Sequence, residues 1–93
     1  MSSRSFGVIF AQPRRSHSYW ENRAALDFTE AVYQRMTTLG LTKSQLAERL
    51  GTSPAYVTKI LGGEANFTLK TMVRLARALE AGVAVHLVPG VET

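Results

Sequence analysis

The segment LAERLGTSPAYVTKILGG (residues 46–63) places a phenol, a hydroxyl and an ammonium group on one side of a short predicted helix. These groups belong to Tyr56, Thr58 and Lys59. The apolar residues of the segment recur at the spacing of one inward-facing helical stripe: Val57, Ile60 and Leu61. Hydrogen-bond donors on the free side of a packed helix are suited to contacting another molecule.

No residue set in the chain matches a catalytic or metal-binding arrangement. His17 and His86 are far apart, and neither has a second ligand at helical or loop spacing. Cysteine is absent, which excludes disulfides, thiol chemistry and cysteine-ligated zinc. A Ser–His–acid set, a carboxylate pair and a phosphate-binding glycine loop are all missing. We therefore predict a protein that is not an enzyme and that uses no cofactor and no metal ion.

Length and charge favour one small domain with an acidic partner. The 93 residues suffice for one domain with a modest core. Eleven Lys and Arg against seven Asp and Glu give a net charge of +4, a bias towards nucleic acid or other polyanions. No apolar run approaches the roughly 20 residues that cross a bilayer, and the apolar stretch near the start is too short for a secretory signal. The sequence predicts a cytoplasmic protein with no membrane segment.

A long first helix is predicted by its capping residues and its periodicity. Ser18 followed by Glu21 has the pattern of a capping box, and Gly40 is in the usual position just past a helix end. One stripe of the helix is apolar at spacings of three and four: Leu26, Thr29, Val32, Tyr33, Met36 and Leu39. The helix is therefore expected to span residues 18–39.

Two shorter helices follow on either side of a glycine. Thr42 and Gln45 form a second capping box, which opens a helix over residues 43–50. Gly51 tolerates the positive φ that a sharp exit from a helix demands. The next helix has a Ser cap at Ser53 and a proline in its first turn, where the missing N–H costs nothing.

The last part of the chain is predicted to contain a fourth helix and a strand. Gly62 and Gly63 are expected to end the third helix, and Thr68 to begin the fourth. The inward face of the fourth helix is predicted to consist of Leu69, Met72, Val73, Ala76 and Leu79. The β-branched segment 83–88 is typical of a strand, and Phe6–Ala11 is a possible N-terminal strand.

The predicted fold class is mainly α, with four or five helices, a short C-terminal strand and a possible N-terminal strand. Residues 1–17 form a basic N-terminal segment without any acid, residues 18–80 the helical domain, and residues 81–93 a C-terminal strand and tail.

The two short helices have the spacing of a bihelical unit. Counted from Lys43 as the first position, Ala47 is fifth, Gly51 ninth, Val57 fifteenth and Ile60 eighteenth. The fifth residue must be small because the second helix crosses over it, and the ninth must tolerate left-handed geometry. The two apolar positions attach the second helix to the domain and leave its other side free.

The segment LTKSQLAERLGTSPAYVTKILGGEANFTLKTMVRLARAL (residues 41–79) resembles the helix-turn-helix domain of the Cro and C1-repressor type, also called the Xre family. The resemblance covers residues 24–80. It implies that the second helix of the unit lies in the major groove of double-stranded DNA. One position departs from the pattern, because Lys43 stands where many members have a glutamine that touches a phosphate.

The resemblance implies one set of residues that contact bases: Pro54, Ala55, Tyr56, Thr58 and Lys59. Lys59 can donate to O6 and N7 of guanine, while Thr58 and Ala55 offer methyl groups to thymine. Tyr56 has a second interpretation, as a partly buried packing residue.

The resemblance also implies phosphate contacts at helix N-termini, from Lys43, Ser44, Ser53, Asn66, Thr68 and Lys70. The alternative for Lys43 and Lys70 is that they are solvated surface charges, which is also the expectation for Arg74 and Arg77. Another pair, Arg14 and Arg15, forms either a minor-groove arm or a basic linker.

A homodimer is expected, because one such domain reads only about four or five base pairs and so has weak specificity against a genome. Two copies about 34 Å apart read successive major grooves of an inverted repeat. The predicted strand offers an apolar edge for pairing with its symmetry mate: Val83, Val85, Leu87 and Val88. This predicts a bacterial or phage-type transcriptional repressor.

Two alternatives remain open at this point. The protein is similar in its trailing strand to antitoxins, which neutralise a toxin protein by direct contact, with or without binding their own promoter. A protein-interaction module that does not bind DNA is the second alternative. No acid lies between Thr52 and Gly63, and Lys59 is basic, which favours DNA on this surface.

Overall fold

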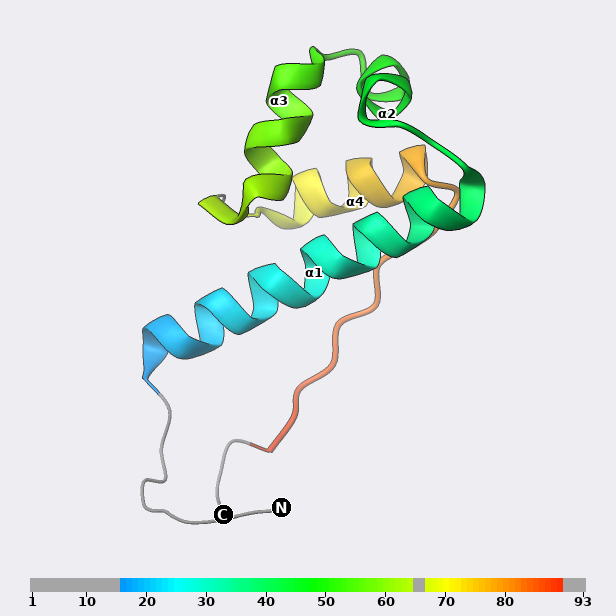
Figure 1. The fold of residues 1–93 in the computed structure, drawn as a ribbon. Coiled ribbons are helices and arrows are strands. Elements are labelled where there is room, and N and C mark those ends of the chain that lie inside the picture. The colour runs from blue at the N-terminus through cyan, green and yellow to red at the C-terminus, as the bar shows by residue number, and fades with distance from the viewer. Residues whose placement is uncertain (1–15, 65–66, 90–93) are drawn as a thin grey trace.

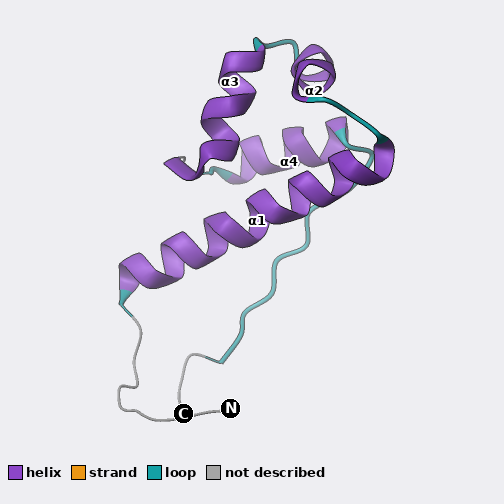
Figure 2. Ribbon diagram, viewed as in Figure 1, coloured by secondary structure: helices purple, strands orange, loops and turns teal. Residues whose placement is uncertain are grey.

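The computed structural model describes residues 16–64 and 67–89, which form four α-helices and one π-helical turn (Figure 1). The elements in chain order are α1 (His17–Leu39), α2 (Lys43–Leu50), α3 (Pro54–Lys59), the π-helical turn η1 (Ile60–Glu64) and α4 (Leu69–Ala78). The described residues contain helices and loops but no strand (Figure 2). The mainly-α prediction is confirmed.

Helix α1 begins earlier than its predicted cap. The side chain of Ser16 accepts a hydrogen bond from the backbone N–H of Tyr19 at 3.1 Å. Ser16 is therefore the N-cap, and the prediction that Ser18 and Glu21 form a capping box was wrong. A hydroxyl two residues upstream was available to satisfy the first free N–H groups. The predicted end at Gly40 is confirmed, since this residue has a left-handed φ of 67°.

Only part of the predicted stripe on α1 is buried. Thr29, Val32 and Met36 are buried, while Leu26 and Tyr33 are exposed. Figure 1 shows that the N-terminal end of α1 extends beyond the other three helices. The hydroxyl of buried Thr29 is satisfied within the helix, because it donates a hydrogen bond to the Ala25 carbonyl at 2.9 Å.

The projecting half of α1 has its own surface contacts. Arg23 donates to the Tyr19 hydroxyl at 3.0 Å and forms an ion pair with Asp27 at 3.5 Å. The hydrogen bond to Tyr19, with a smaller effect from Asp27, raises the pKa of Arg23. Tyr19 and Trp20 meet edge to face, with ring centroids 5.1 Å apart.

All four helices and the π-helical turn η1 contribute to one hydrophobic core. Its buried members are Val32, Met36, Leu46, Ala47, Val57, Ile60, Leu61, Leu75 and Leu79. Helices α2 and α3 lie above α1 and α4 in Figure 1. Phe28 of α1 contacts Phe67, just before α4, with ring centroids 4.9 Å apart. The core therefore lies directly beneath the pair formed by α2 and α3.

Helix α4 buries only part of the side that was predicted to face inward, with Met72 half-buried. Leu75, which was not in the predicted face, is 1% exposed, whereas Leu69 is 65% exposed. Val73 is exposed as well, while Ala76 and Leu79 are buried as expected. The apolar residues of α4 cover a wide arc, and the contacts with α1 and α2 determine which part of that arc is buried.

The glycine pair after α3 does not end the helix. Gly62 and Gly63 lie within η1, where the chain continues from α3 into a wider π-helical turn. Ile60 and Leu61, the first residues of this turn, are both buried. The prediction of a helix stop at Gly62 was wrong, since one π-helical turn extends the helix by several residues.

The C-terminal segment is not a strand in the single chain. Residues 81–89 have no regular secondary structure, so the prediction of a strand over 83–88 was wrong for this state. A strand requires a neighbour for its N–H and C=O groups, and no described segment of the chain pairs with it. The predicted N-terminal strand Phe6–Ala11 lies outside the described residues, as do Arg14 and Arg15.

Substituting Gly51 with alanine should destabilise the fold through its backbone alone. Gly51 has a φ of 72°, and a Cβ built there meets no atom within 4 Å. We expect Gly51→Ala to lower the free energy of unfolding by about 1–2 kcal/mol, the usual cost of left-handed geometry for a residue with a Cβ. Gly51→Asn should cost less, because asparagine adopts this geometry more readily. Urea denaturation of both variants measures the difference, and equal losses would contradict this explanation.

Candidate nucleic-acid interface

The turn between α2 and α3 is held by local hydrogen bonds. At the start of α2, Thr42 and Gln45 exchange the two bonds of a capping box, at 2.9 and 3.1 Å. At its end, the N–H groups of Gly51 and Thr52 bond to carbonyls of the last turn, at 3.1 and 2.9 Å. Ser53 then accepts from the Tyr56 N–H at 3.2 Å and caps α3. These bonds confirm the predicted caps on both helices.

The inner side of α3 is fully packed against the rest of the domain. Val57 is 0% exposed, and Ile60 and Leu61 are also buried. On the facing helix, Ala47 is 1% exposed, in agreement with the expectation that a small residue is required where α3 crosses. Because its inner side is packed this tightly, α3 is held rigidly by the domain.

The outer side of α3 is free. All five predicted base-contacting residues are exposed to solvent: Pro54, Ala55, Tyr56, Thr58 and Lys59. The side chain of Tyr56 is 38% exposed, which leaves it partly packed against the domain. The structure thus brings these side chains together on one accessible surface, which we call the α3 face. Their contacts with bases stay a prediction.

The predicted phosphate-contacting residues lie at the starts of three helices. Lys43 and Ser44 are exposed at the start of α2, and Lys70 is exposed at the start of α4. Ser53 uses its oxygen as an acceptor for the α3 cap, which leaves its O–H able to donate to a phosphate. Asn66 lies outside the described residues.

Thr68 caps α4, in agreement with its predicted position at the start of that helix, and its predicted contact with a phosphate stays a prediction. Its hydroxyl accepts from the Thr71 N–H at 3.1 Å and donates to the Thr71 hydroxyl at 3.0 Å. The oxygen of Thr68 therefore caps α4, while its O–H is engaged with the Thr71 hydroxyl. A phosphate at this helix start would meet the free backbone N–H groups of the first turn instead.

Three arginines contribute contacts that the sequence did not reveal. Arg74 is exposed, as expected, but it donates to the Leu50 carbonyl at 3.1 Å and so caps the end of α2 beside the turn. Arg35 and Arg49 hold carbonyls at the end of α4. Because the acceptors are backbone carbonyls, which every residue carries, no side-chain pattern could have indicated these pairs.

In this geometry, the capped helix α2 is followed by a sharp turn and by the short, tightly packed helix α3. The polar side of α3 is open to solvent. A family model described as helix-turn-helix matches residues 32–84, more than half of the chain. The chain belongs to the helix-turn-helix family of the Cro/C1 type. Neither a curated protein nor a solved structure matches the chain with statistical significance.

Membership of the helix-turn-helix family establishes the general role of the chain as a DNA-binding regulator. The match includes α2, α3 and α4 completely, but it begins inside α1 and ends within the C-terminal segment. Among the described residues, no helix combines the length and apolar character that crossing a bilayer requires. Likewise, no group of three His, Cys, Asp or Glu side chains in the described part is placed to hold a metal ion.

Proposed function

We propose that this helix-turn-helix protein is a transcriptional repressor that binds an inverted repeat in double-stranded DNA as a homodimer. The α3 face enters the major groove, where Lys59 donates to guanine and Thr58 contacts a neighbouring base. Lys43, Ser44, Ser53 and Lys70 bind phosphates on either side. The observation that carries this proposal is the exposure of Thr58 and Lys59 on a helix whose opposite side is fully buried.

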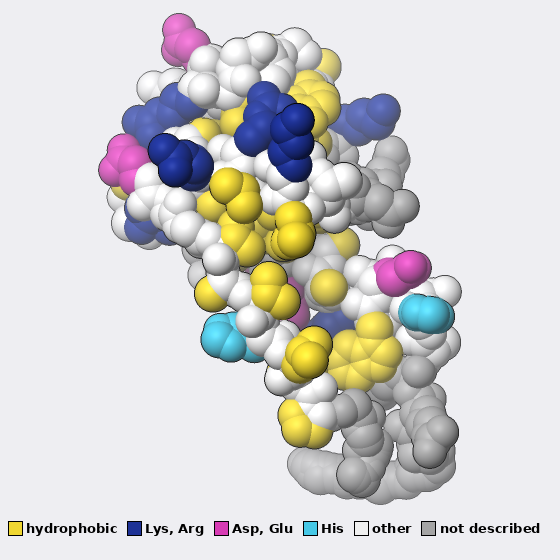
Figure 3. Space-filling view, turned by 180° about the vertical axis from the view of Figure 1, so that it is seen from behind, with side chains coloured by type: hydrophobic (Ala, Val, Ile, Leu, Met, Phe, Trp, Pro, Cys, Tyr) yellow, Lys and Arg dark blue, Asp and Glu magenta, His cyan; other side chains and the backbone are white. Residues whose placement is uncertain are grey.

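The homodimer forms through the C-terminal segment, which we call the tail (residues 81–89). In Figure 3, hydrophobic side chains follow the tail away from the part of the molecule where dark blue Lys and Arg side chains gather. Leu87 is 96% exposed, and Val85 and Val88 are also exposed. Pairing with the tail of a second copy supplies backbone partners for both tails and covers these side chains, together with Val83.

Selection of binding sites from random duplex DNA tests the proposed function. We expect the full-length protein to enrich an inverted repeat whose half-sites are about 10 base pairs apart from centre to centre. Enrichment of a single, unrepeated half-site would contradict the homodimer. Failure to enrich any sequence would contradict specific DNA recognition.

Affinity for the selected site should fall steeply with salt. If Lys43 and Lys70 of each protomer neutralise one phosphate each, the dimer neutralises four. A plot of log K against log salt concentration then has a slope of about −3 to −4. Lys43→Ala should weaken specific and non-specific binding alike and make the slope of the dimer shallower by about 2. Arg23→Ala, which removes an exposed cation far along α1, is the control and should leave the slope unchanged. A slope near zero for the unmodified protein would rule out phosphate contacts by these lysines.

A further inference from the structure

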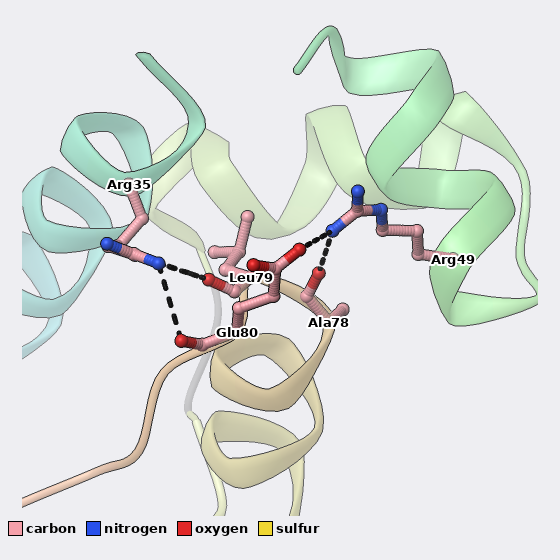
Figure 4. A network of polar contacts seen from close by, with 5 residues as sticks. All are labelled: Arg35, Arg49, Ala78, Leu79 and Glu80. Atoms are coloured by element: carbon pink, nitrogen blue, oxygen red, sulfur yellow. Dashed lines mark hydrogen bonds and ion pairs between the residues drawn. The ribbon is translucent and has the colours of Figure 1, made fainter. Parts of the chain in front are cut away.

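The root of the tail, Ala78–Glu80, is held by an arginine from α1. The Arg35 guanidinium donates to the Leu79 carbonyl through Nη2 at 2.9 Å and Nε at 3.2 Å, and to the Glu80 carbonyl at 3.3 Å (Figure 4). A planar guanidinium that bonds to two successive carbonyls restrains both their position and their orientation. Arg35 therefore restrains the direction in which the chain leaves α4.

A second arginine holds the same root from α2. Arg49 donates to the Ala78 carbonyl at 2.8 Å and lies 3.4 Å from the Glu80 carboxylate (Figure 4). Three successive carbonyls, from Ala78 to Glu80, are thus bound by side chains of two other helices. The end of α4 is tied to both α1 and α2.

The backbone at Glu80 makes the turn that these bonds support. Glu80 has a φ of 59°, in the left-handed region that residues with a Cβ rarely adopt. The N–H of Glu80 bonds to the Arg77 carbonyl at 3.1 Å, and the N–H of Ala81 to the Ala76 carbonyl at 2.8 Å. The chain therefore leaves α4 through one defined, disfavoured conformation at Glu80.

Beyond Ala81, the tail makes no backbone hydrogen bond within the described chain, and its side chains Val85, Leu87 and Val88 are exposed. A loose tail would not need a root held by two arginines and a left-handed residue. Since the domain also holds α3 rigidly, the root links the direction of the tail to the orientation of the α3 face.

We propose that Arg35, assisted by Arg49 and Glu80, is a positioning residue that sets the spacing between the two DNA half-sites. This inference rests on the proposed homodimer. If two tails pair, the angle at each root determines the separation and relative rotation of the two α3 helices. Moving one half-site by one base pair displaces it by about 3.4 Å and rotates it by about 35° around the duplex. A fixed root accepts one spacing, and a loosened root accepts several.

The experiment measures binding to a series of inverted repeats with the same half-sites, whose spacing differs from the preferred one by −2 to +2 base pairs. For the full-length protein we expect a preference of at least about tenfold, or about 1.4 kcal/mol, for one spacing over its neighbours. Arg35→Ala should bind the whole series within about threefold, mainly through weaker binding to the preferred repeat. Arg35→Lys, which keeps the charge but not the planar fork, should lie between the two.

Two further variants and two measurements separate positioning from general destabilisation. Arg23→Ala removes an arginine from the same helix whose described partners, Tyr19 and Asp27, belong to α1 itself, and it should keep the full spacing preference. Glu80→Gly keeps the left-handed turn accessible, removes the pairing with Arg49, and should also relax the preference. Circular dichroism and sedimentation check that each variant is helical and dimeric.

The possible outcomes distinguish this inference from the function on which it rests. An unmodified protein that binds no repeat, or binds as a monomer, overturns the proposed function and this inference with it. An unmodified dimer with a clear spacing preference that Arg35→Ala and Glu80→Gly both retain overturns the positioning role alone. If Arg35→Ala does not fold, Glu80→Gly decides, and an unchanged preference in that variant likewise overturns the positioning role.

Discussion

Leu75→Ala should lower the free energy of unfolding by about 2–5 kcal/mol, the usual cost of truncating a leucine in a packed core. Leu75 is 1% exposed and belongs to the core cluster at the centre of the domain. Removing three carbon atoms there leaves a cavity that its neighbours fill only in part. For a domain of this size, at about 5 °C per kcal/mol, the melting temperature should fall by roughly 10–25 °C. Thermal and urea denaturation followed by circular dichroism measure both quantities.

Leu69→Ala is the matched control for this prediction. It makes the same chemical change in the same helix, but Leu69 is 65% exposed, so the expected loss is below about 0.5 kcal/mol. The pair decides which side of α4 faces the core. Equal effects of the two variants, or a larger effect at Leu69, would show that the observed orientation of α4 is wrong.

Replacing Thr58 and Lys59 together by alanine should abolish most of the preference for the selected site. A lysine or arginine contact with guanine contributes about 1–3 kcal/mol of discrimination, which doubles over two half-sites. Specific affinity should therefore fall at least about 30-fold. Non-specific affinity should fall less than about tenfold, because only one phosphate-attracting charge per protomer is lost. Titrations against the selected site and against a scrambled duplex measure the two losses.

The control for this double variant is Arg23→Ala combined with Thr38→Ala. Both residues are exposed on α1, and the pair removes one positive charge and one threonine, as the test variant does. The control should change specific and non-specific affinity by similar, small factors. If the Thr58–Lys59 variant loses both affinities equally, the α3 face does not read bases.

The caps and the turn were predictable because they depend on neighbouring residues. Thr42 and Gln45 satisfy each other's backbone across three positions, and Gly51 takes a conformation that few other residues accept. The same holds for Ser53 and Pro54 at the start of α3. Even here one error occurred, since two serines near the start of α1, Ser16 and Ser18, offered competing caps and the structure uses Ser16.

The orientation of α4 was not predictable by the same means. Its apolar residues occupy enough of the helix circumference that two different sides look suitable for burial. Leu69 and Val73 fit the pattern as well as Leu75 does, and only the positions of α1 and α2 separate them. The prediction of a strand in the tail was wrong for a related reason. β-branched residues favour a strand, but a strand also needs a partner that the described chain does not provide.

The sequence by itself determined the helix caps, the sharp turn at Gly51 and the free side of α3, because hydrogen bonds and backbone preferences within a few residues control these features. Only the tertiary structure decided which side of α4 is buried, that α1 extends beyond the core, and that Arg35 and Arg49 hold the root of the tail. Those features depend on contacts between segments tens of residues apart. The two arginines in addition donate to backbone carbonyl groups, which every residue carries. Local chemistry therefore indicated the surface that we propose faces DNA, while long-range packing determined how that surface is oriented relative to the tail.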